Sequence, residues 1–371
     1  MLLVLLCVAC ILSAVSHRAD NSPTYAEEAV YVYCGEGGVE VNALAAAVLE
    51  AESGRLLFAH NADTPLPMAS TTKIMTAVCV LENAELKTEF TVCKEATEIE
   101  GSSLYLRVGE LFTVEELLYG LMLESGNDAA VALAIATAGD VESFVKLMNA
   151  KATEIGLKNT RFANPNGLPA EEHYTTAEEL ARLTAYALNV EGFEEICATR
   201  TKVLESDGHI TRYLNNHNKL LGSYGGMIGV KTGYTAAAGR CLVTAARRNG
   251  MTLVAVTLND RNDWTDHRRM LDYGFGAYKM ETVCKEGESV GIAVKEGKAA
   301  SVLGLVKETV RVCVPTDSDI EKIYDIKTLT APVKAGQAVG KIKIYSENAL
   351  IKEVPLYAQK AVGKKRKWLF F

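Results

Sequence analysis

A serine and a lysine lie three residues apart in a segment that is otherwise small and apolar. The segment "MASTTKIMTA" (residues 68–77) holds the hydroxyl of Ser70 and the ammonium of Lys73. On a helix the two side chains would share one face, because positions i and i+3 are neighbours there. A serine hydroxyl is a poor nucleophile until a base removes its proton, and a lysine can be that base only as a neutral amine. The pair therefore suggests nucleophilic catalysis by Ser70, with burial lowering the pKa of Lys73.

Two further polar groups could complete such a site. They are Ser125–Gly126–Asn127 and Lys231–Thr232–Gly233. The first interrupts two apolar helical patterns, so it is expected to face a cleft, and the second opens a β-rich stretch. Neither an S-x-x-K nor a K-T-G is specific alone, since a helical lysine is usually a solvated surface group and a K-T-G is usually a turn. Their order and structural context make the combination specific.

Hydrophobic patterns and turn residues predict the elements that carry these groups. Residues 43–63 form two apolar runs around a turn at 52–54, which indicates a β-hairpin. Residues 70–81 are apolar nearly all round, as expected of a buried helix, and Ser70 would start it. Residues 229–260 give two β-rich runs around Arg248, Asn249 and Gly250, the pattern of an antiparallel hairpin.

Two capping signals predict further helices. Thr113 with Glu116 precedes an apolar helix that breaks at residues 125–127, and a second helix restarts at Asp128. Thr176 with Glu179 precedes the helical pattern "AEELARLTAYAL". Helices and β-hairpins thus occupy residues 25–280, which we assign to one large α+β domain.

The C-terminal part of the chain has a different character. Beyond about Met280 helical periodicity disappears, and short β-rich segments predict a small all-β domain over residues 281–358. Residues 359–371 form a basic and aromatic tail that contains Lys364, Lys365, Arg366 and Lys367. Such a tail is either a solvated end or a weak interfacial membrane anchor, and we favour the anchor.

The N-terminus and the composition predict where the protein acts and which partners it lacks. Residues 1–16, "MLLVLLCVACILSAVS", read as a secretory signal peptide cut near Ser16, with an uncleaved anchor as the alternative because the segment lacks Lys and Arg, so we expect an exported protein. The chain has 371 residues, 49% of them hydrophobic, which suits two globular domains. A net charge of −7 argues against nucleic acid as a partner.

We predict no metal, because the histidines lack ligand spacing, and no cofactor. The scattered cysteines imply no disulfide framework, although a bond between any two stays open.

The three motifs in this order resemble the active-site signatures of the penicillin-recognising serine enzymes. The surrounding segments "LPMASTTKIMTA", "GSSLYLRVGELFTVEELLYGLMLESGNDAA", "NPNGL" with "HYTTA", and "GVKTGYTAAAGRCLV" resemble D-alanyl-D-alanine carboxypeptidases of the low-molecular-weight penicillin-binding type, serine peptidase family S11. The resemblance covers about residues 43–280, and the β domain is similar to the family's architecture. It implies a DD-peptidase/β-lactamase-like fold of the α+β class, with an antiparallel sheet flanked by helices and a small all-β domain after it.

The resemblance also implies a role for each motif. Ser70 would be the nucleophile and Lys73 its base, with the charge of Lys231 helping to lower the pKa of Lys73. Ser125 would relay a proton to the leaving amine, and Asn127 would bind Lys73 and the substrate's peptide group. The carboxylate of the substrate would lie on Lys231 and Thr232.

The strand that follows would complete the substrate site. Gly233 would let the substrate lie against the strand, and the N–H groups of Ser70 and Tyr234 would form the oxyanion hole. His217 would approach the carboxylate, although a surface histidine is the simpler interpretation. His173 and Tyr174 are expected to fix a loop, and Arg240 to supply a charge behind the site.

The function implied is an exported serine carboxypeptidase that removes the terminal D-alanine from peptidoglycan stem peptides ending in D-Ala-D-Ala. β-Lactams would acylate the same serine. A β-lactamase is one alternative, but class A enzymes carry an E-x-x-L-N segment, and the Leu-Asn pairs at Leu188, Leu214 and Leu258 all lack its glutamate. A non-catalytic penicillin-binding sensor or wall-associated protein is the other, and the three intact motifs argue against it.

Overall fold

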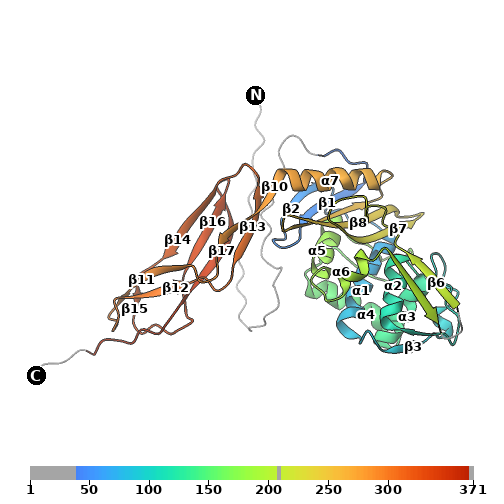
Figure 1. The fold of residues 1–371 in the computed structure, drawn as a ribbon, viewed down its shortest axis with the longest axis horizontal. Helices are drawn as coiled ribbons and strands as arrows, with labels where there is room; N and C mark the ends of the chain where they lie inside the picture. The colour runs from blue at the N-terminus through green and yellow to red at the C-terminus, as the bar shows by residue number, and fades with distance from the viewer. Residues whose placement is uncertain (1–38, 207–209, 367–371) are drawn as a thin grey trace, which may run out of the picture.

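Two units of different character make up the described protein. The computed structural model describes residues 39–206 and 210–366, so the predicted signal peptide and the last five residues lie outside it. Figure 1 shows a unit of helices and sheet joined end to end with an elongated all-β unit, which carries the C-terminus at its far end. The prediction of an α+β fold with an antiparallel sheet, flanking helices and a C-terminal β domain is confirmed.

The larger unit contains all seven α-helices of the described chain and nine of its strands. The helices are α1 (Lys73–Asn83), α2 (Val114–Leu123), α3 (Asn127–Ala138), α4 (Val141–Glu154), α5 (Ala177–Ala187), α6 (Phe193–Ala198) and α7 (Asp263–Ala277). The strands are β1 (Ala45–Glu50), β2 (Leu56–His60), β3 (Glu89–Thr91), β4 (Leu111–Thr113), β5 (Thr201–Ser206), β6 (Ile210–Asn215), β7 (Met227–Thr235), β8 (Gly239–Arg248) and β9 (Met251–Leu258). The next strand, β10 (Tyr278–Cys284), begins the β unit.

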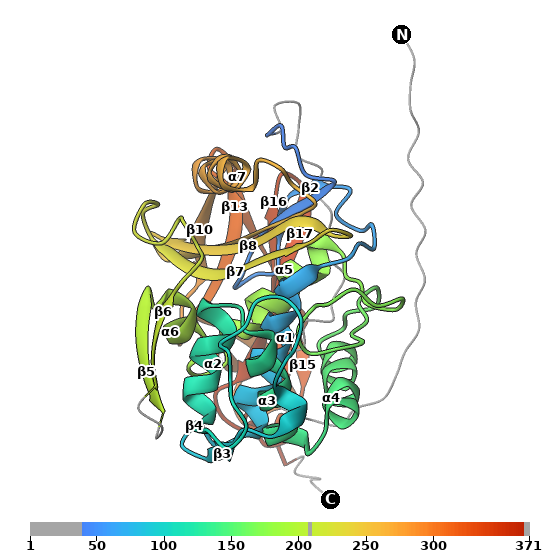
Figure 2. The ribbon, with the colours of Figure 1, turned by 90° about the vertical axis from the view of Figure 1, so that its right-hand side faces the viewer.

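A five-stranded antiparallel sheet, in the order β2-β1-β9-β8-β7, lies between two layers of helix. Figure 2 shows α7 on one face and α1, α2, α3 and α5 beyond the other. Alternate residues of β1 serve the two layers: Ala45, Ala47 and Leu49 pack towards the helical side, while Ala46 and Val48 pack towards α7. Because both faces are covered, β1 is a continuous apolar run rather than an alternating one.

The predicted hairpins are confirmed. β1 pairs with β2 as expected for residues 43–63, and β8 pairs with β9 around the predicted turn. Asn249 and Gly250 both have positive φ, 50° and 75°, which a tight two-residue hairpin turn requires. The first of the two predicted β-rich runs is itself two antiparallel strands, β7 and β8, and β7 carries Lys231 to Gly233.

Two predicted helix starts are wrong by a few residues. Ser70 lies in a 3-10 turn (Ala69–Thr72), and α1 begins at Lys73. The hydroxyls of Thr71 and Thr72 bond the carbonyls three residues back, of Met68 and Ala69, and so favour the tighter turn. The helix after the break, α3, begins at Asn127 rather than Asp128.

The two predicted capping pairs differ in the structure. Thr113 and Glu116 form the reciprocal capping box at α2. Thr176 caps α5 by accepting from the N–H of Glu179, but the Glu179 carboxylate does not accept the reciprocal bond from the N–H of Thr176. That carboxylate instead accepts bonds from residues 158–160 and so fixes the preceding loop to α5.

The β unit continues directly from α7. Its further strands are β11 (Ser289–Lys295), β12 (Ser301–Leu305), β13 (Val310–Pro315), β14 (Ile320–Ile326), β15 (Leu329–Thr330), β16 (Ala338–Ser346) and β17 (Ala349–Ala358). Strand β10 starts at Tyr278 and pairs with β13, slightly before the expected start at 281. Isolated bridges at Val362 and Lys364 carry the pairing past the expected end at 358. Arg55 of the larger unit donates to the Cys313 carbonyl at 2.7 Å, which ties the two units together.

Candidate functional site

The amine of Lys73 is the centre of the site. Its Nζ lies 2.9 Å from Ser70 Oγ, 2.6 Å from Asn127 Oδ1, 3.4 Å from Ser125 Oγ and 2.9 Å from the Asn166 carbonyl. The 3-10 turn and α1 supply Ser70 and Lys73, while the break between α2 and α3 supplies Ser125 and Asn127. The structure therefore brings three other predicted site residues, Ser70, Ser125 and Asn127, to the amine of Lys73.

Burial and charge both act on Lys73. The residue is fully buried, and desolvation together with the positive charge of Lys231 holds its pKa well below the usual value, against a smaller opposing effect of Asp128. A neutral amine also fits its neighbours. The oxygens of Asn127 and Asn166 can only accept, so they take its two N–H groups and leave the lone pair for the hydroxyl of Ser70. This arrangement can remove the serine proton.

The break between α2 and α3 is strained and tightly held. Ser125 has a φ of 63°, a conformation that a non-glycine residue rarely adopts. Asn127 donates from Nδ2 to the Glu100 carbonyl at 2.5 Å, which leaves its Oδ1 facing Lys73. A Cβ at Gly101, whose φ is +90°, would come within 2.8 Å of that Nδ2. The loop before β4 thus sets the orientation of the Asn127 amide.

Asp128, in the first turn of α3, holds the same loop by hydrogen bonds. The carboxylate is buried and accepts from the Ser103 hydroxyl at 2.6 Å and from the N–H groups of Leu104 and Leu106 at 3.0 and 3.1 Å. Arg212 of β6 donates to the Leu104 carbonyl at 2.8 Å and pairs with the buried Glu110 at 2.7 Å. These bonds join the loop before β4 to the start of α3.

The predicted substrate strand, β7, lies beside Ser70. A Cβ on Gly233 would come within 3.0 Å of the Ser70 nitrogen, so a side chain there would push the two backbones apart by a few tenths of an ångström. Lys231 is buried, and its Nζ donates to the Thr232 carbonyl at 2.9 Å. Burial lowers the pKa of Lys231 to about 7, although the nearby Cys197 and Glu124 act to raise it. Tyr234 is 69% exposed at the rim.

His217 lies outside the cluster around Lys73. Its side chain is exposed, and its Nε2 is 3.3 Å from a carboxylate oxygen of Glu124, the residue before Ser125. Its role at the carboxylate stays a prediction. Arg240 forms a two-pronged pair with the buried Asp263, at 2.8 Å, and so braces β8 against α7. His173 and Tyr174 hold a loop as expected: Tyr174 exchanges two backbone bonds with Arg161.

The contact of the Asn166 carbonyl with Lys73 was not predicted from the sequence. A backbone oxygen has no side-chain signature, but the following Gly167 offered one. Its φ is +90°, and a Cβ there would collide with the Ala69 carbonyl. The "NPNGL" segment is therefore shaped to lie against the turn that carries Ser70.

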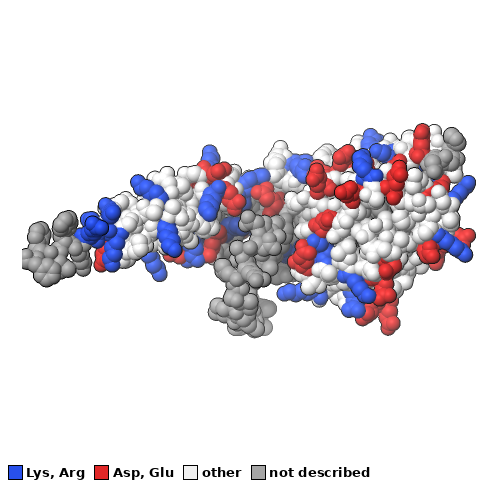
Figure 3. Space-filling model, turned by 90° about the horizontal axis from the view of Figure 1, so that it is seen from below, with Lys and Arg blue, Asp and Glu red and all other residues white. Residues whose placement is uncertain are grey.

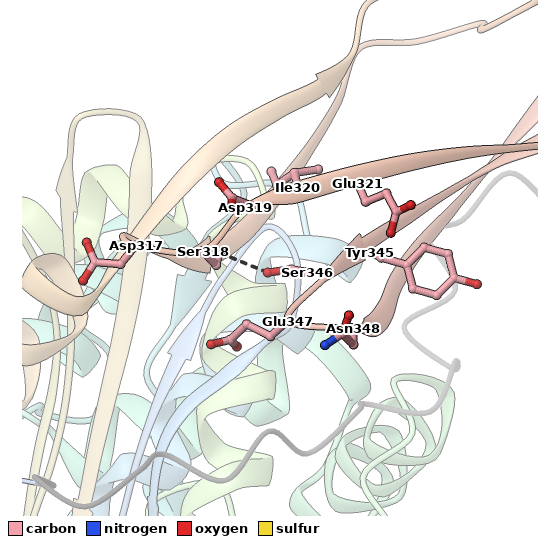
Figure 4. A pocket seen from close by; sticks show the side chains of 9 residues that line it. All are labelled: Asp317, Ser318, Asp319, Ile320, Glu321, Tyr345, Ser346, Glu347 and Asn348. Carbon is pink, nitrogen blue, oxygen red and sulfur yellow. Dashed lines mark hydrogen bonds between the residues drawn. The ribbon is translucent and has the colours of Figure 1, made fainter.

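Other features of the described residues lie away from these motifs. A hollow of about 390 Å³ in the β unit is lined by Asp317, Asp319, Glu321 and Glu347 among others, and a 3.0 Å bond joins Ser318 and Ser346 beside it (Figure 4). It contains none of the predicted site residues. In the described part of the chain, no three side chains of the metal-binding types lie close enough to hold an ion.

Two family models match the chain. The D-alanyl-D-alanine carboxypeptidase family matches residues 33–262, and the C-terminal domain of penicillin-binding protein 5 matches residues 278–364. Among curated relatives, the D-alanyl-D-alanine carboxypeptidase DacF of Bacillus subtilis is 33% identical over 87% of this chain and 86% of its own. DacC of Escherichia coli is also 33% identical, over 87% of this chain and 84% of its own.

Solved structures are also similar to this chain in fold. Penicillin binding protein 5 from Haemophilus influenzae superposes with a TM-score of 0.80 at 26% identity and covers 89% of this chain and 100% of its own. The Streptomyces K15 DD-transpeptidase is 34% identical with a TM-score of 0.61, over 64% of this chain and 98% of its own. From these matches and the three motifs gathered around Lys73, the chain belongs to the D-alanyl-D-alanine carboxypeptidase family of serine hydrolases.

Proposed function

We propose that this protein removes the terminal D-alanine from peptidoglycan stem peptides ending in D-Ala-D-Ala, through an acyl-enzyme on Ser70. The observation that carries the proposal is the set of four contacts at Lys73 Nζ, which leaves the lone pair of a neutral amine facing Ser70. Family membership supports the reaction type.

The proposed steps use the contacts at Lys73. Lys73 takes the proton of Ser70 Oγ, which attacks the carbonyl carbon of the penultimate D-alanine. The N–H groups of Ser70 and Tyr234 stabilise the oxyanion that forms. Ser125, 3.4 Å from Lys73, passes the proton to the nitrogen of the leaving D-alanine, and the C–N bond breaks. Water then attacks the ester, and Ser70 regains its proton as the shortened peptide leaves.

Recognition of a C-terminal carboxylate is assigned to Lys231 and Thr232. An anion at Lys231 would favour its protonated form, because an opposite charge nearby raises the pKa of an amine. The same change strengthens the repulsion that keeps Lys73 neutral, since Lys231 is the charge that acts on it. Substrate binding would thus prepare the base. A β-lactam carries a carboxylate and a reactive amide in a similar relation, so it would acylate Ser70.

The test of the proposal is turnover of diacetyl-Lys-D-Ala-D-Ala by the mature protein, followed as released D-alanine. We expect release of D-alanine from this peptide and no release of L-alanine from the analogue that ends in D-Ala-L-Ala, with free alanine of either configuration measured. The proposal fails if a correctly folded, penicillin-reactive preparation releases no D-alanine.

We further propose that the enzyme acts outside the cytoplasm, held at the membrane surface by the end of its β unit. Figure 3 shows Lys and Arg side chains gathered there, at the end away from the catalytic unit. Backbone bonds join the contributing segments, 295–298 and 363–365. The exposed basic residues of this end are Lys295, Lys298, Lys334, Lys364, Lys365 and Arg366. Among the described residues no helix is long and apolar enough to cross a bilayer.

Deleting residues 364–371 should release the protein from vesicles that contain anionic lipid. Each basic side chain contributes about 1 kcal/mol near such a surface, and salt screens that attraction. High salt should release the full chain only in part, because burial of Trp368, Leu369, Phe370 and Phe371 is insensitive to screening. Turnover of a soluble peptide should not change, since the motifs end before Tyr234.

Vesicle sedimentation measures this directly. The matched control replaces Lys87, Lys146 and Lys158, exposed residues of the catalytic unit, with glutamine, and it should pellet like the unchanged protein. Equal pelleting of the full-length and truncated chains would reject the anchor and leave the tail as a solvated end.

A further inference from the structure

The carbonyl of Asn166 needs an accurate position, because it binds both members of the nucleophile pair. It accepts from Lys73 Nζ at 2.9 Å and lies 3.5 Å from Ser70 Oγ. It belongs to a turn in which the Asn164 side chain bonds the backbone: Asn164 accepts from the N–H of Gly167 at 2.7 Å and donates to the Leu168 carbonyl at 2.9 Å. Those bonds shape the turn but do not join it to α1.

Two side chains make that connection. Thr76 of α1 donates to the Pro165 carbonyl at 2.6 Å. On the other side, His173 Nδ1 accepts from the N–H of Ala163 at 2.9 Å, and its Nε2 lies 2.7 Å from Thr72 Oγ1. Thr72 stands between Ser70 and Lys73 in the chain. The imidazole therefore spans from the turn of Asn166 to the turn of the nucleophile.

The hydrogen positions of this connection are determined by its partners. Nδ1 accepts a backbone N–H, so it carries no hydrogen, and Nε2 is the protonated nitrogen that donates to Thr72. The hydroxyl of Thr72 sends its own hydrogen to the Ala69 carbonyl at 2.8 Å. His173 is buried beside Phe162, and burial lowers its pKa to about 4, which keeps the ring in this neutral form.

We propose that His173 is a positioning residue for the reaction: by joining Ala163 to Thr72 it sets the Asn166 carbonyl against Lys73 and so directs the lone pair of Lys73 at Ser70. If the turn moves away, the amine loses one of the two acceptors that orient it. A displacement of about 1 Å at a reacting group can cost on the order of 100-fold in rate. The inference rests on the proposed roles of Ser70 and Lys73, and it adds a residue that contacts neither.

Two substitutions of His173 each keep one hydrogen-bonding function of the imidazole and remove the other. His173→Asn keeps an acceptor near the position of Nδ1 and removes the donor to Thr72. His173→Gln keeps a donor near the position of Nε2 and removes the acceptor for Ala163. Thr72→Val removes the hydroxyl that receives the Nε2 hydrogen. We expect each variant to lose about 10-fold or more in kcat and in the rate of acylation by penicillin, while KM stays within about twofold.

The chain offers a matched control in His267. This histidine is also buried and lies between two threonine hydroxyls, 2.7 Å from Thr244 and 3.1 Å from Thr257. It belongs to α7, on the opposite face of the sheet from α1. His267→Gln removes a ring of the same kind and should leave the acylation rate per active site within about twofold.

The experiment counts active sites by penicillin titration and then measures pre-steady-state acylation, so that unfolded protein does not contribute. The double variant Thr72→Val with His173→Asn should be no slower than the slower single variant, because both changes remove the same bond. The proposal is overturned if His173→Asn and Thr72→Val acylate within twofold of the unchanged enzyme, if His267→Gln is equally slow, or if the two losses multiply. A failure of the proposed function is distinct, because the unchanged enzyme would then acylate with penicillin and release no D-alanine.

Discussion

Replacing Ser70 with alanine should abolish covalent labelling by a fluorescent penicillin and turnover of the peptide substrate. The hydroxyl is the only group lost, and it is the one within 2.9 Å of Lys73 Nζ that can form an ester. Ser125 is 3.4 Å from the same amine, a longer contact, and its place in the proposed mechanism is to pass a proton to the leaving nitrogen. We therefore expect no second serine to take over the reaction.

The fold should survive this change. The Ser70 hydroxyl contacts Lys73 and, at 3.5 Å, the Asn166 carbonyl, and Lys73 keeps its bonds to Asn127 and Asn166. Thermal unfolding of Ser70→Ala should match the unchanged protein within a few degrees. Ser318→Ala, in the β unit, is the control and should label normally. Gel fluorescence and mass spectrometry of the labelled peptide decide the outcome, and a label found on any other serine would disprove the assignment of the nucleophile.

The sequence could predict the side chains of the site because the chemistry requires particular residue types. Ser70, Lys73, Ser125 and Asn127 come from two segments far apart in the chain, and the fold brings them to one amine. Their helices could also be predicted, since a capping box at Thr113 and an apolar run leave few alternatives. The motifs and the elements that carry them agree with each other.

Backbone contributions could not be predicted in this way. The Asn166 carbonyl meets Lys73 across 93 residues of chain, and no side-chain type marks a carbonyl. The 3-10 turn at Ser70 was missed because the hydroxyls of Thr71 and Thr72 compete with the regular helical bonding, which a hydrophobic pattern does not report. The first feature depends on a long-range contact to a backbone oxygen and the second on local hydrogen bonds.

The hairpin β5–β6 was also missed, for a different reason. Its partners Val203 and Tyr213 face each other in register and are 48% and 73% exposed. A hairpin with little buried surface lacks the alternation of apolar and polar residues on which strand prediction relies. Its contribution to the site is through Arg212, whose bonds to the loop before β4 hold that loop against Asn127 and Asp128.

Lys73→Ala and Lys231→Ala should both damage the enzyme, but in different ways. Lys73→Ala removes the proposed base, and a general base contributes about 10²- to 10⁴-fold, so the acylation rate should fall by that order with a modest change in binding. Lys231→Ala removes the proposed partner of the carboxylate. A hydrogen bond to a charged group contributes about 1.5–3 kcal/mol, so the apparent affinity for peptide and penicillin should weaken by roughly 10- to 100-fold.

The pH profile separates the two roles further. The charge of Lys231 helps to hold the pKa of Lys73 low, so its removal should raise that pKa. The neutral amine is the active form of a base, and a higher pKa means that it appears only at higher pH. The acid limb of the acylation rate should therefore move to higher pH in Lys231→Ala, with the plateau above it largely recovered. In Lys73→Ala this limb should disappear, since the group that titrates is gone.

A Lys231→Arg variant sharpens the test. It keeps a positive charge near Lys73, so the acid limb should stay close to its original pH, while the larger guanidinium fits the buried position poorly and affinity should still fall. Stopped-flow acylation from about pH 5 to 10 measures rate and affinity together. If both alanine variants gave the same profile, with neither a shifted nor a lost acid limb, the separate roles of base and carboxylate partner would be unsupported. If Lys231→Ala shifts the acid limb and Lys231→Arg does not, the positive charge at position 231 helps to set the pKa of Lys73. Binding of the substrate's carboxylate at Lys231 would then control the protonation of the base.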